Sequence, residues 1–153
     1  MPENIVIADT SCLIALANIK ALHLLKDLYS NIFITPEIAR EFDEIIPGWI
    51  LVEEVANKNY LQILATRLDI GEASAIALAM EKRNVLLILD DLKGRKEAEK
   101  LGFAITGTLG ILFKAKRENI IESIKPYLNS LKTVGFRISS ELETNILQRS
   151  GEK

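Results

Sequence analysis

The sequence predicts an α/β domain with three layers (α/β/α), in which helices cover both faces of a mostly parallel central sheet. Short apolar runs alternate with segments of helical spacing along the chain, a pattern that implies right-handed crossovers between parallel strands. The clearest run, Val85-Leu86-Leu87-Ile88-Leu89, has no polar interruption, which is typical of a strand buried on both faces of a parallel sheet. No repeat or linker divides the chain, so residues 1–153 are expected to form a single domain.

The chain is expected to begin with a strand followed by a helical segment. Ile5-Val6-Ile7-Ala8 is a short run rich in β-branched residues and predicts a buried strand that ends at Asp9. Apolar residues at helical spacing then predict two short helices or one bent helix over residues 11–29. A second compact apolar run, residues 32–34, predicts the next strand.

Two turn signals delimit the elements that follow. Thr35-Pro36 predicts the start of a helix over residues 37–46, because threonine caps helices and proline favours their first position. Pro47-Gly48 ends this helix, and residues 49–52 form a run short enough for an edge strand. Residues 57–68 have the apolar stripe of a further helix.

An alanine-rich segment leads into the second half of the predicted sheet. Asp69-Ile70-Gly71-Glu72 opens a helix over residues 73–82 that is apolar nearly all round, as a helix packed against a sheet would be. The elements expected next are a strand at residues 85–89, a helix at 92–100 and a strand at 103–105.

Helices are expected to fill the C-terminal part of the chain, residues 109–150. They are predicted at residues 109–116, across 120–131 and from Ser139 or Ser140, with Glu143 downstream, towards Gln148. These segments carry more apolar surface than a peripheral segment needs. They are therefore expected either to complete the core or to form an interface.

Composition and charge limit the class of protein. Apolar residues make up 48% and charged residues 26% of the chain, which is ordinary globular composition. The net charge of -2 argues against a generic nucleic-acid coat, whose affinity comes from excess Lys and Arg, but not against a nuclease that holds cations. Cys12 has no disulfide partner, no apolar run is long enough to span a membrane, and Met1-Pro2-Glu3-Asn4 lacks the basic start of a signal peptide. A cytoplasmic location without membrane contact is therefore expected.

Carboxylates gather where the strands are expected to end. Asp9 and the Asp90-Asp91 pair follow two apolar runs, and Thr106-Gly107-Thr108 follows a third. The carboxyl ends of parallel strands lie along one edge of a sheet, where α/β proteins place their ligand crevices. Glu41 and Glu72 are candidates to join this edge from neighbouring helices.

Such a cluster of acids favours a metal-dependent hydrolase. Like charges a few ångströms apart raise one another's pKa values, and a hard cation relieves the repulsion. Oxygen ligands without cysteine or histidine suit Mg²⁺ or Mn²⁺ rather than zinc. One or two such ions generate hydroxide from water and stabilise the leaving oxygen of a phosphodiester, so the predicted chemistry is metal-assisted phosphodiester hydrolysis.

At these residues the sequence resembles the PIN-domain family, in particular the VapC-like toxin nucleases of toxin-antitoxin pairs and their close relatives. The likeness runs from Ile5 to about Leu147. The residues that match the family's acids are Asp9, which precedes Thr10 and Ser11, then Glu41, Glu72 and either Asp90 or Asp91. The spacing in the family favours Asp91 over Asp90, and Glu72 stands where the wider family commonly has aspartate.

The resemblance implies a PIN-like fold and an endoribonuclease that depends on Mg²⁺ or Mn²⁺, with these acids as ligands and a bound water as nucleophile. Thr10 or Ser11 would support the first acid. The resemblance further implies an RNA substrate, a homodimer and, for toxin members, an inhibitory antitoxin protein.

Each candidate residue also has a structural interpretation. The acids that precede an expected helix, where aspartate is a common cap, are Asp9, Asp69 and Asp91. Asp69 and Glu72 have the spacing of a capping box. Thr106 and Thr108 are interpreted first as helix caps and second as groups that orient metal-bound water or a phosphate.

Local pattern does not separate Glu41 from its neighbours, because Glu37 and Glu44 share its helix face. Only the family match selects Glu41. Three basic residues that follow the aspartate pair are interpreted as a solvated helix face, or as contacts to an RNA backbone: Lys93, Arg95 and Lys96.

The main alternative function is a non-catalytic PIN-like module that binds RNA or a protein. Four mutually repelling carboxylates argue against it, because a scaffold has no physical need for them. Phosphotransfer through Asp9 is weaker, since haloacid-dehalogenase-like phosphatases place a second aspartate where Ser11 stands. A histidine-pair ribonuclease mechanism is excluded by the presence of a single histidine, His23.

Overall fold

The computed structural model of the chain describes residues 4–152. Residues 1–3, on which the expectation about a signal peptide partly rests, and residue 153, the last of the predicted domain, lie outside the described residues. The strands are β1 (Ile5–Ala8), β2 (Ile32–Ile34), β3 (Ile50–Val52), β4 (Val85–Ile88) and β5 (Ala104–Thr106). The helices are α1 (Thr10–Asn18), α2 (His23–Tyr29), α3 (Pro36–Phe42), α4 (Lys58–Ala65), α5 (Ile70–Met80), α6 (Leu92–Lys100), α7 (Thr108–Arg117), α8 (Lys125–Thr133) and α9 (Ser140–Arg149).

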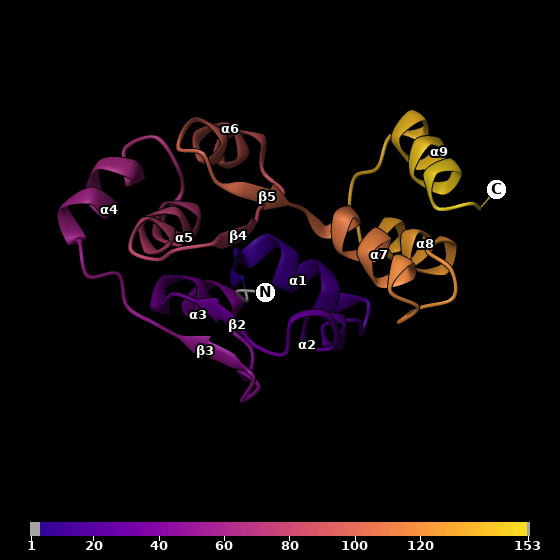
Figure 1. Cartoon of the computed structure of the whole chain (residues 1–153), viewed down its shortest axis with the longest axis horizontal. Helices are drawn as coiled ribbons and strands as arrows, with labels where there is room; N and C mark the ends of the chain where they lie inside the picture. The colour runs from indigo at the N-terminus through magenta and orange to yellow at the C-terminus, as the bar shows by residue number, and fades with distance from the viewer. Residues whose placement is uncertain (1–3, 153) are drawn as a thin grey trace.

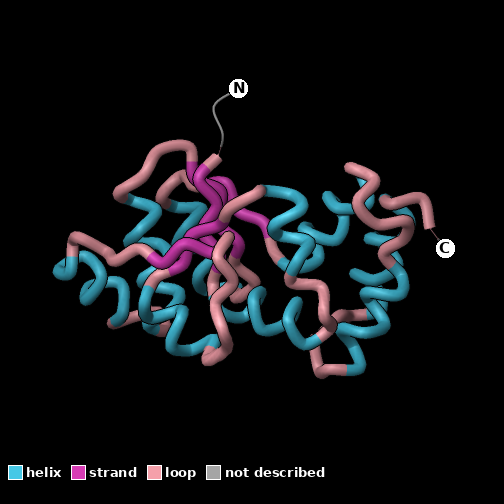
Figure 2. The backbone as a smooth tube through the Cα atoms, turned by 90° about the horizontal axis from the view of Figure 1, so that it is seen from below, coloured by secondary structure: helices cyan, strands magenta, loops and turns pink. Residues whose placement is uncertain are grey.

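Within residues 4–152, the strands form one five-stranded sheet in the order β3-β2-β1-β4-β5, and every pairing is parallel. Helices lie on both sides of this sheet (Figures 1 and 2). The predicted three-layer α/β fold is therefore confirmed. The short strand β3 lies at one edge of the sheet, as its brevity and the preceding proline predict.

The central strands β1 and β4 end side by side. Ala8 pairs with Ile88 in the parallel register, and the backbone N–H of Asp9 donates to the carbonyl oxygen of Ile88 at 3.0 Å. Asp9 and Asp90 therefore leave the sheet at neighbouring positions on its carboxyl edge, as the positions of the two apolar runs predict.

Helix α5 lies in the core. Every residue from 71 to 79 is buried, including Glu72 at 4% exposure, which matches the apolar composition of this segment on all sides. Cys12 is also fully buried, and burial raises the pKa of its thiol, so this residue packs as a small apolar side chain in the core.

Two predicted helices differ most from their bounds in the structure. The helix expected over residues 37–46 ends at Phe42, because Asp43 takes a left-handed conformation with φ of 53°. The helix expected across residues 120–131 begins only at Lys125, with proline in its first turn. Residues 120–124 form bends and irregular backbone instead, since proline favours the start of a helix and disfavours its interior.

The end of the chain fixes the start of α8. The Glu152 carboxylate accepts hydrogen bonds from the backbone N–H groups of Ile124 and Lys125 at 2.8 and 3.1 Å, and from Lys116 Nζ at 2.8 Å. The side chains of Leu128, Leu131 and Leu147 are buried, so α8 and α9 supply part of the core.

None of the described helices combines the length and the apolar character that a membrane crossing requires.

Candidate functional site

Asp9 is a buried carboxylate at the end of the central strand. It caps α1, since its Oδ1 accepts a hydrogen bond from the Thr10 backbone N–H at 2.7 Å, and its exposure is 4%. Burial raises the pKa of Asp9 to about 7. The bond from Thr10 opposes this rise, and the carboxylates of Asp69, Glu41 and Asp90 add to it. The predicted role as a cap is confirmed, but this cap also lies among several other acids.

Glu41 reaches this position from α3. The Thr10 hydroxyl donates to Glu41 Oε1 at 2.6 Å, although the two residues are 31 positions apart in sequence. Gly71, in the first turn of α5, leaves the space for this carboxylate, because a Cβ atom there would overlap Glu41 Oε1. A side chain at position 71 would thus displace the Glu41 carboxylate.

A buried polar contact holds α3 against α5. The hydroxyls of Thr35 and Ser74 lie 2.6 Å apart within hydrogen-bonding distance, and both residues are fully buried. Thr35 also caps α3 through the Ile38 N–H, at 3.1 Å, as the Thr-Pro pair predicts. This contact fixes the helices that carry Glu41 and Glu72 relative to each other.

Glu72 is the second buried acid. Burial is the largest cause that raises its pKa to about 8, and its interactions with Asp69, Asp91 and Asp9 add to the rise. Its carboxylate lies against Gly94 of α6, where a Cβ atom would come within 3.2 Å of Oε2. Of the two hydrogen bonds of a capping box, the structure shows the one from the Glu72 N–H to Asp69 Oδ1, at 2.9 Å. The Glu72 carboxylate lies towards α6 instead of turning back to Asp69.

The two aspartates after β4 have different surroundings. Both carboxylate oxygens of Asp90 accept hydrogen bonds from Thr108, from its backbone N–H at 2.8 Å and its hydroxyl at 2.6 Å. Asp91 caps α6 by accepting from the Lys93 N–H at 3.1 Å. The interpretation of Thr106 and Thr108 as helix caps is wrong, since Gly107 occupies the cap position of α7 and the Thr108 hydroxyl bonds Asp90 instead.

The predicted acids thus gather at one edge of the sheet and act on one another electrostatically. Among the residues that the structure describes, however, no three Asp, Glu, His or Cys side chains lie close enough together to hold one metal ion as they stand. Local hydrogen bonds hold Asp9, Glu41, Asp90 and Asp91. Mutual repulsion of like charges also favours their separation.

The sequence itself places the chain in a family. The sequence model of a family described as a PIN domain matches residues 5–152. The chain belongs to the PIN-domain family. Members of this family are generally nucleases and typically use divalent metals. No match was found among curated proteins or among solved structures.

In this PIN domain, the three glutamates predicted to share one helix face have different surroundings, and Glu44 lies beyond the end of α3. Glu37 lies 4.0 Å from Arg40 on its own helix, whereas Glu41 bonds Thr10 beside the buried Asp9. Ser11, predicted with Thr10 as a supporting residue, is exposed in the first turn of α1. Its supporting role stays a prediction.

Asp69 also lies among the acids at the carboxyl edge of the sheet, but the sequence analysis predicted it only as a helix cap. It is exposed and caps α5, but its charge raises the pKa values of both Asp9 and Glu72. The capping-box spacing was visible in the sequence, and it already placed Asp69 one turn away from Glu72. A cap beside a predicted acidic residue is therefore also a candidate member of the same site.

Proposed function

We propose that this PIN domain is a metal-dependent endoribonuclease that hydrolyses RNA phosphodiester bonds. The observation that carries the proposal is the pair of buried acids at the carboxyl edge of the sheet, Asp9 and Glu72, each 4% exposed. Burial of acidic groups beside further carboxylates is costly. A fold that keeps such a group indicates a functional site more often than a structural one.

The donor set fits the cation that the family typically uses. Every proposed ligand is a carboxylate: Asp9, Glu41, Glu72 and Asp91, with Asp90 as a further candidate. Hard oxygen donors of this kind suit Mg²⁺ and Mn²⁺. When bound, such an ion supplies a Lewis acid that lowers the pKa of water and offsets charge on the phosphodiester.

The chain's own residues set the conditions for this chemistry. Raised pKa values mean that the Asp9 and Glu72 carboxyls hold protons at a higher pH than ordinary acids do, so the charged site is favoured as the pH rises. Thr10 orients Glu41 through its hydroxyl, and Thr108 holds both oxygens of Asp90. The predicted role of Thr106 and Thr108 in orienting water or phosphate belongs to this proposal.

An RNA cleavage assay with Mg²⁺ or Mn²⁺ tests the proposal. We expect the wild-type chain to cleave single-stranded RNA and Asp9→Asn to lose cleavage by at least about 100-fold, about 2.7 kcal/mol in the barrier. Glu99→Gln is the matched control, because Glu99 is an exposed carboxylate on α6. Equal cleavage by Asp9→Asn, or none by the wild type across varied RNAs and both metals, would reject the proposal.

The same assay distinguishes the nuclease from the alternative function, a non-catalytic module that binds RNA or a protein. A wild-type chain that binds RNA tightly without cutting it would favour the non-catalytic module. The toxin role further predicts that expression of the wild-type chain, but not of Asp9→Asn, arrests growth. The homodimer, an antitoxin partner and the cytoplasmic location stay predictions.

A further inference from the structure

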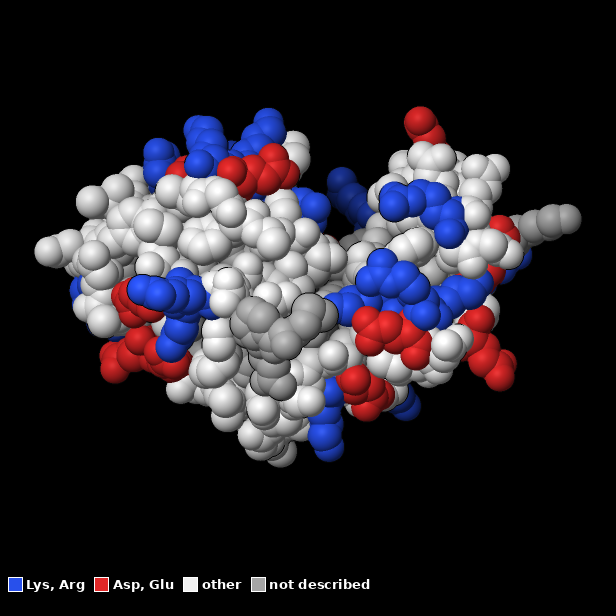
Figure 3. All heavy atoms as spheres, in the orientation of Figure 1, with Lys and Arg blue, Asp and Glu red and all other residues white. Residues whose placement is uncertain are grey.

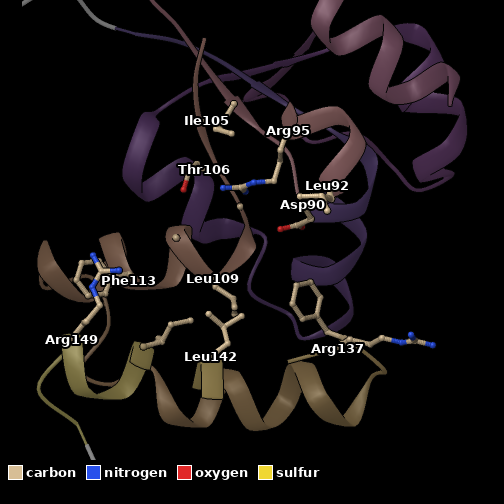
Figure 4. Close-up of a pocket in the computed structure, with 14 residues that line it drawn as sticks. Asp90, Leu92, Arg95, Ile105, Thr106, Leu109, Phe113, Arg137, Leu142 and Arg149 are labelled. Atoms are coloured by element: carbon tan, nitrogen blue, oxygen red, sulfur yellow. The ribbon is translucent and has the colours of Figure 1, made fainter. Parts of the chain in front are cut away.

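A groove with a volume of about 770 Å³ lies between α6 and the C-terminal helices, beside Asp90. Figure 4 shows Asp90 and Arg95 on one side of it, and Leu109 and Phe113 facing Leu142 and Arg149 on the other. Figure 3 shows a hollow in the surface, with basic side chains on its borders. The volume lies within the range of about 300 to 1,000 Å³ that is usual for ligand sites.

The charge of this groove is mainly positive. Arg95, Arg137 and Arg149 line it, and Asp90 is the one carboxylate among the lining residues. In the described part of the chain, none of the ion pairs involves any of these arginines. Guanidinium groups without a carboxylate partner match the geometry of phosphate oxygens. The groove therefore fits an anionic ligand.

The groove also offers aromatic and aliphatic surface. Phe113 and Phe136 line it and are each half-buried. The Arg149 guanidinium lies 5.4 Å from the centre of the Phe113 ring, an arrangement that holds a cation and a flat apolar surface together. A ligand that matches both features carries phosphates and exposed ring faces.

Single-stranded nucleic acid has both properties. Its bases stack on aromatic side chains while its backbone follows a basic groove. A duplex hides its base faces, and the deep major groove of A-form RNA does not admit side chains. The combination of arginines and phenylalanines in this groove thus favours a single strand.

The groove borders the acidic site at Asp90. Asp90 lines it, and the charge of Asp90 also raises the pKa of Asp9. Arg95 follows the same aspartate pair and is held by a hydrogen bond from its Nη1 to the Leu89 carbonyl oxygen at 2.8 Å. A strand that lies in the groove therefore passes Asp90, the neighbour of Asp91 in the chain.

We propose that this groove binds the single-stranded RNA segment next to the bond that is cut, with Arg95, Arg137 and Arg149 on its phosphates and Phe136 against a base. The inference rests on the proposed function and adds the surface that holds the substrate. It also gives the C-terminal segment a role beyond its contribution to the core.

Fluorescence anisotropy tests the inference without any cleavage. The probe is a labelled single-stranded RNA of about 12 nucleotides, in EDTA, with Arg137→Gln and Phe136→Ala as groove variants. Arg83→Gln is the matched control, since Arg83 is exposed and precedes β4, at the opposite end of that strand. Thermal unfolding of each variant checks that it is folded.

We expect the Kd for the single strand to rise at least about fivefold in Phe136→Ala, through loss of one stacked base. In Arg137→Gln the slope of log K against log salt should fall by about 0.7, the value for one phosphate contact on a single strand. Arg83→Gln should change neither quantity. A merely structural role of Arg137 would not change the salt slope.

Equal affinities and salt slopes in the groove variants and Arg83→Gln would overturn the inference, while RNA cleavage by the wild type would leave the proposed function standing. Equally tight binding of a matched RNA duplex or of polyglutamate, with the same losses, would also overturn it. Groove-dependent binding by a wild type that never cleaves would keep the groove as a site for single-stranded RNA, but it would reject the nuclease and with it the placement of the groove next to a bond that is cut.

Discussion

The Thr10 hydroxyl donates a 2.6 Å hydrogen bond to the Glu41 carboxylate and thereby connects the first turn of α1 to α3. The backbone N–H of the same threonine donates to Asp9. One residue thus positions two of the proposed ligands. This relationship gives the Asp9-Thr10 pair a physical role, because the hydroxyl fixes an exposed glutamate next to a buried aspartate.

Removal of this hydroxyl should loosen Glu41 and leave the fold intact. Thr10→Val keeps the size and the backbone donor but loses the bond, which is exposed to competing water and so contributes little to stability. We expect kcat/KM for RNA cleavage to fall about tenfold and the unfolding midpoint to change little. Thr10→Ser is the control that restores the hydroxyl. Wild-type cleavage by Thr10→Val would show that the bond does not position Glu41.

Gly71 provides a test of space rather than of charge. Alanine is the better helix former by about 1 kcal/mol, but a Cβ at position 71 would overlap the Glu41 carboxylate. We therefore expect Gly71→Ala to lower cleavage at least about tenfold while it folds as well as the wild type. Gly48→Ala is the control, because no atom lies within 4 Å of its added Cβ. Equal activity of both variants would mean that Glu41 can move aside without loss.

Asp90 and Asp91 should respond differently to substitution. Asp91 interacts with Glu72, whereas both oxygens of Asp90 are bonded to Thr108. We expect Asp91→Asn to lower cleavage by about 100-fold or more and Asp90→Asn to lower it less. Asp90→Ala should cost about 2 kcal/mol of unfolding free energy, because it leaves the buried Thr108 donors without an acceptor. The reverse order of activities in the two Asn variants would make Asp90 the fourth ligand.

The sequence is sufficient to predict the strand ends and their acids, because both depend on local pattern. Apolar runs give β1 and β4, and their parallel register brings Asp9 and Asp90 together. The helix bounds are harder to predict from local sequence. Pro126 marks the start of α8 locally, but the carboxylate that accepts hydrogen bonds there is Glu152, 27 residues after Lys125, and the local pattern does not indicate this contact.

Side-chain pairing across the site is also beyond the sequence pattern. Helical spacing makes Glu37, Glu41 and Glu44 equivalent, and only packing decides which of them meets Thr10. Similarly, a threonine before a helix is most often a cap, but the Asp90 carboxylate draws the Thr108 hydroxyl away from that role. Such choices depend on contacts between distant elements.

The stability of the metal-free chain should depend on pH through Asp9. Its pKa is raised from 3.8 to about 7 in the folded chain, so the folded state binds this proton more tightly than the unfolded state does. This contribution to stability is full below about pH 3.8 and is lost as the pH rises through about 7. Ionised Asp9 therefore lowers the unfolding free energy of the wild type above neutrality.

Asp9→Asn should reverse this loss. Asparagine keeps an oxygen that can cap α1 through the Thr10 N–H, but it cannot ionise. In EDTA we expect urea unfolding to show Asp9→Asn gaining stability relative to the wild type between pH 5 and pH 8, by about 1.4 kcal/mol for each pH unit from 5 up to the folded-state pKa of about 7. The proposed metal site requires charged carboxylates, so Mn²⁺ should stabilise the wild type at pH 8 and the variant much less. A stability difference that is the same at both pH values would mean that Asp9 is already ionised throughout this range.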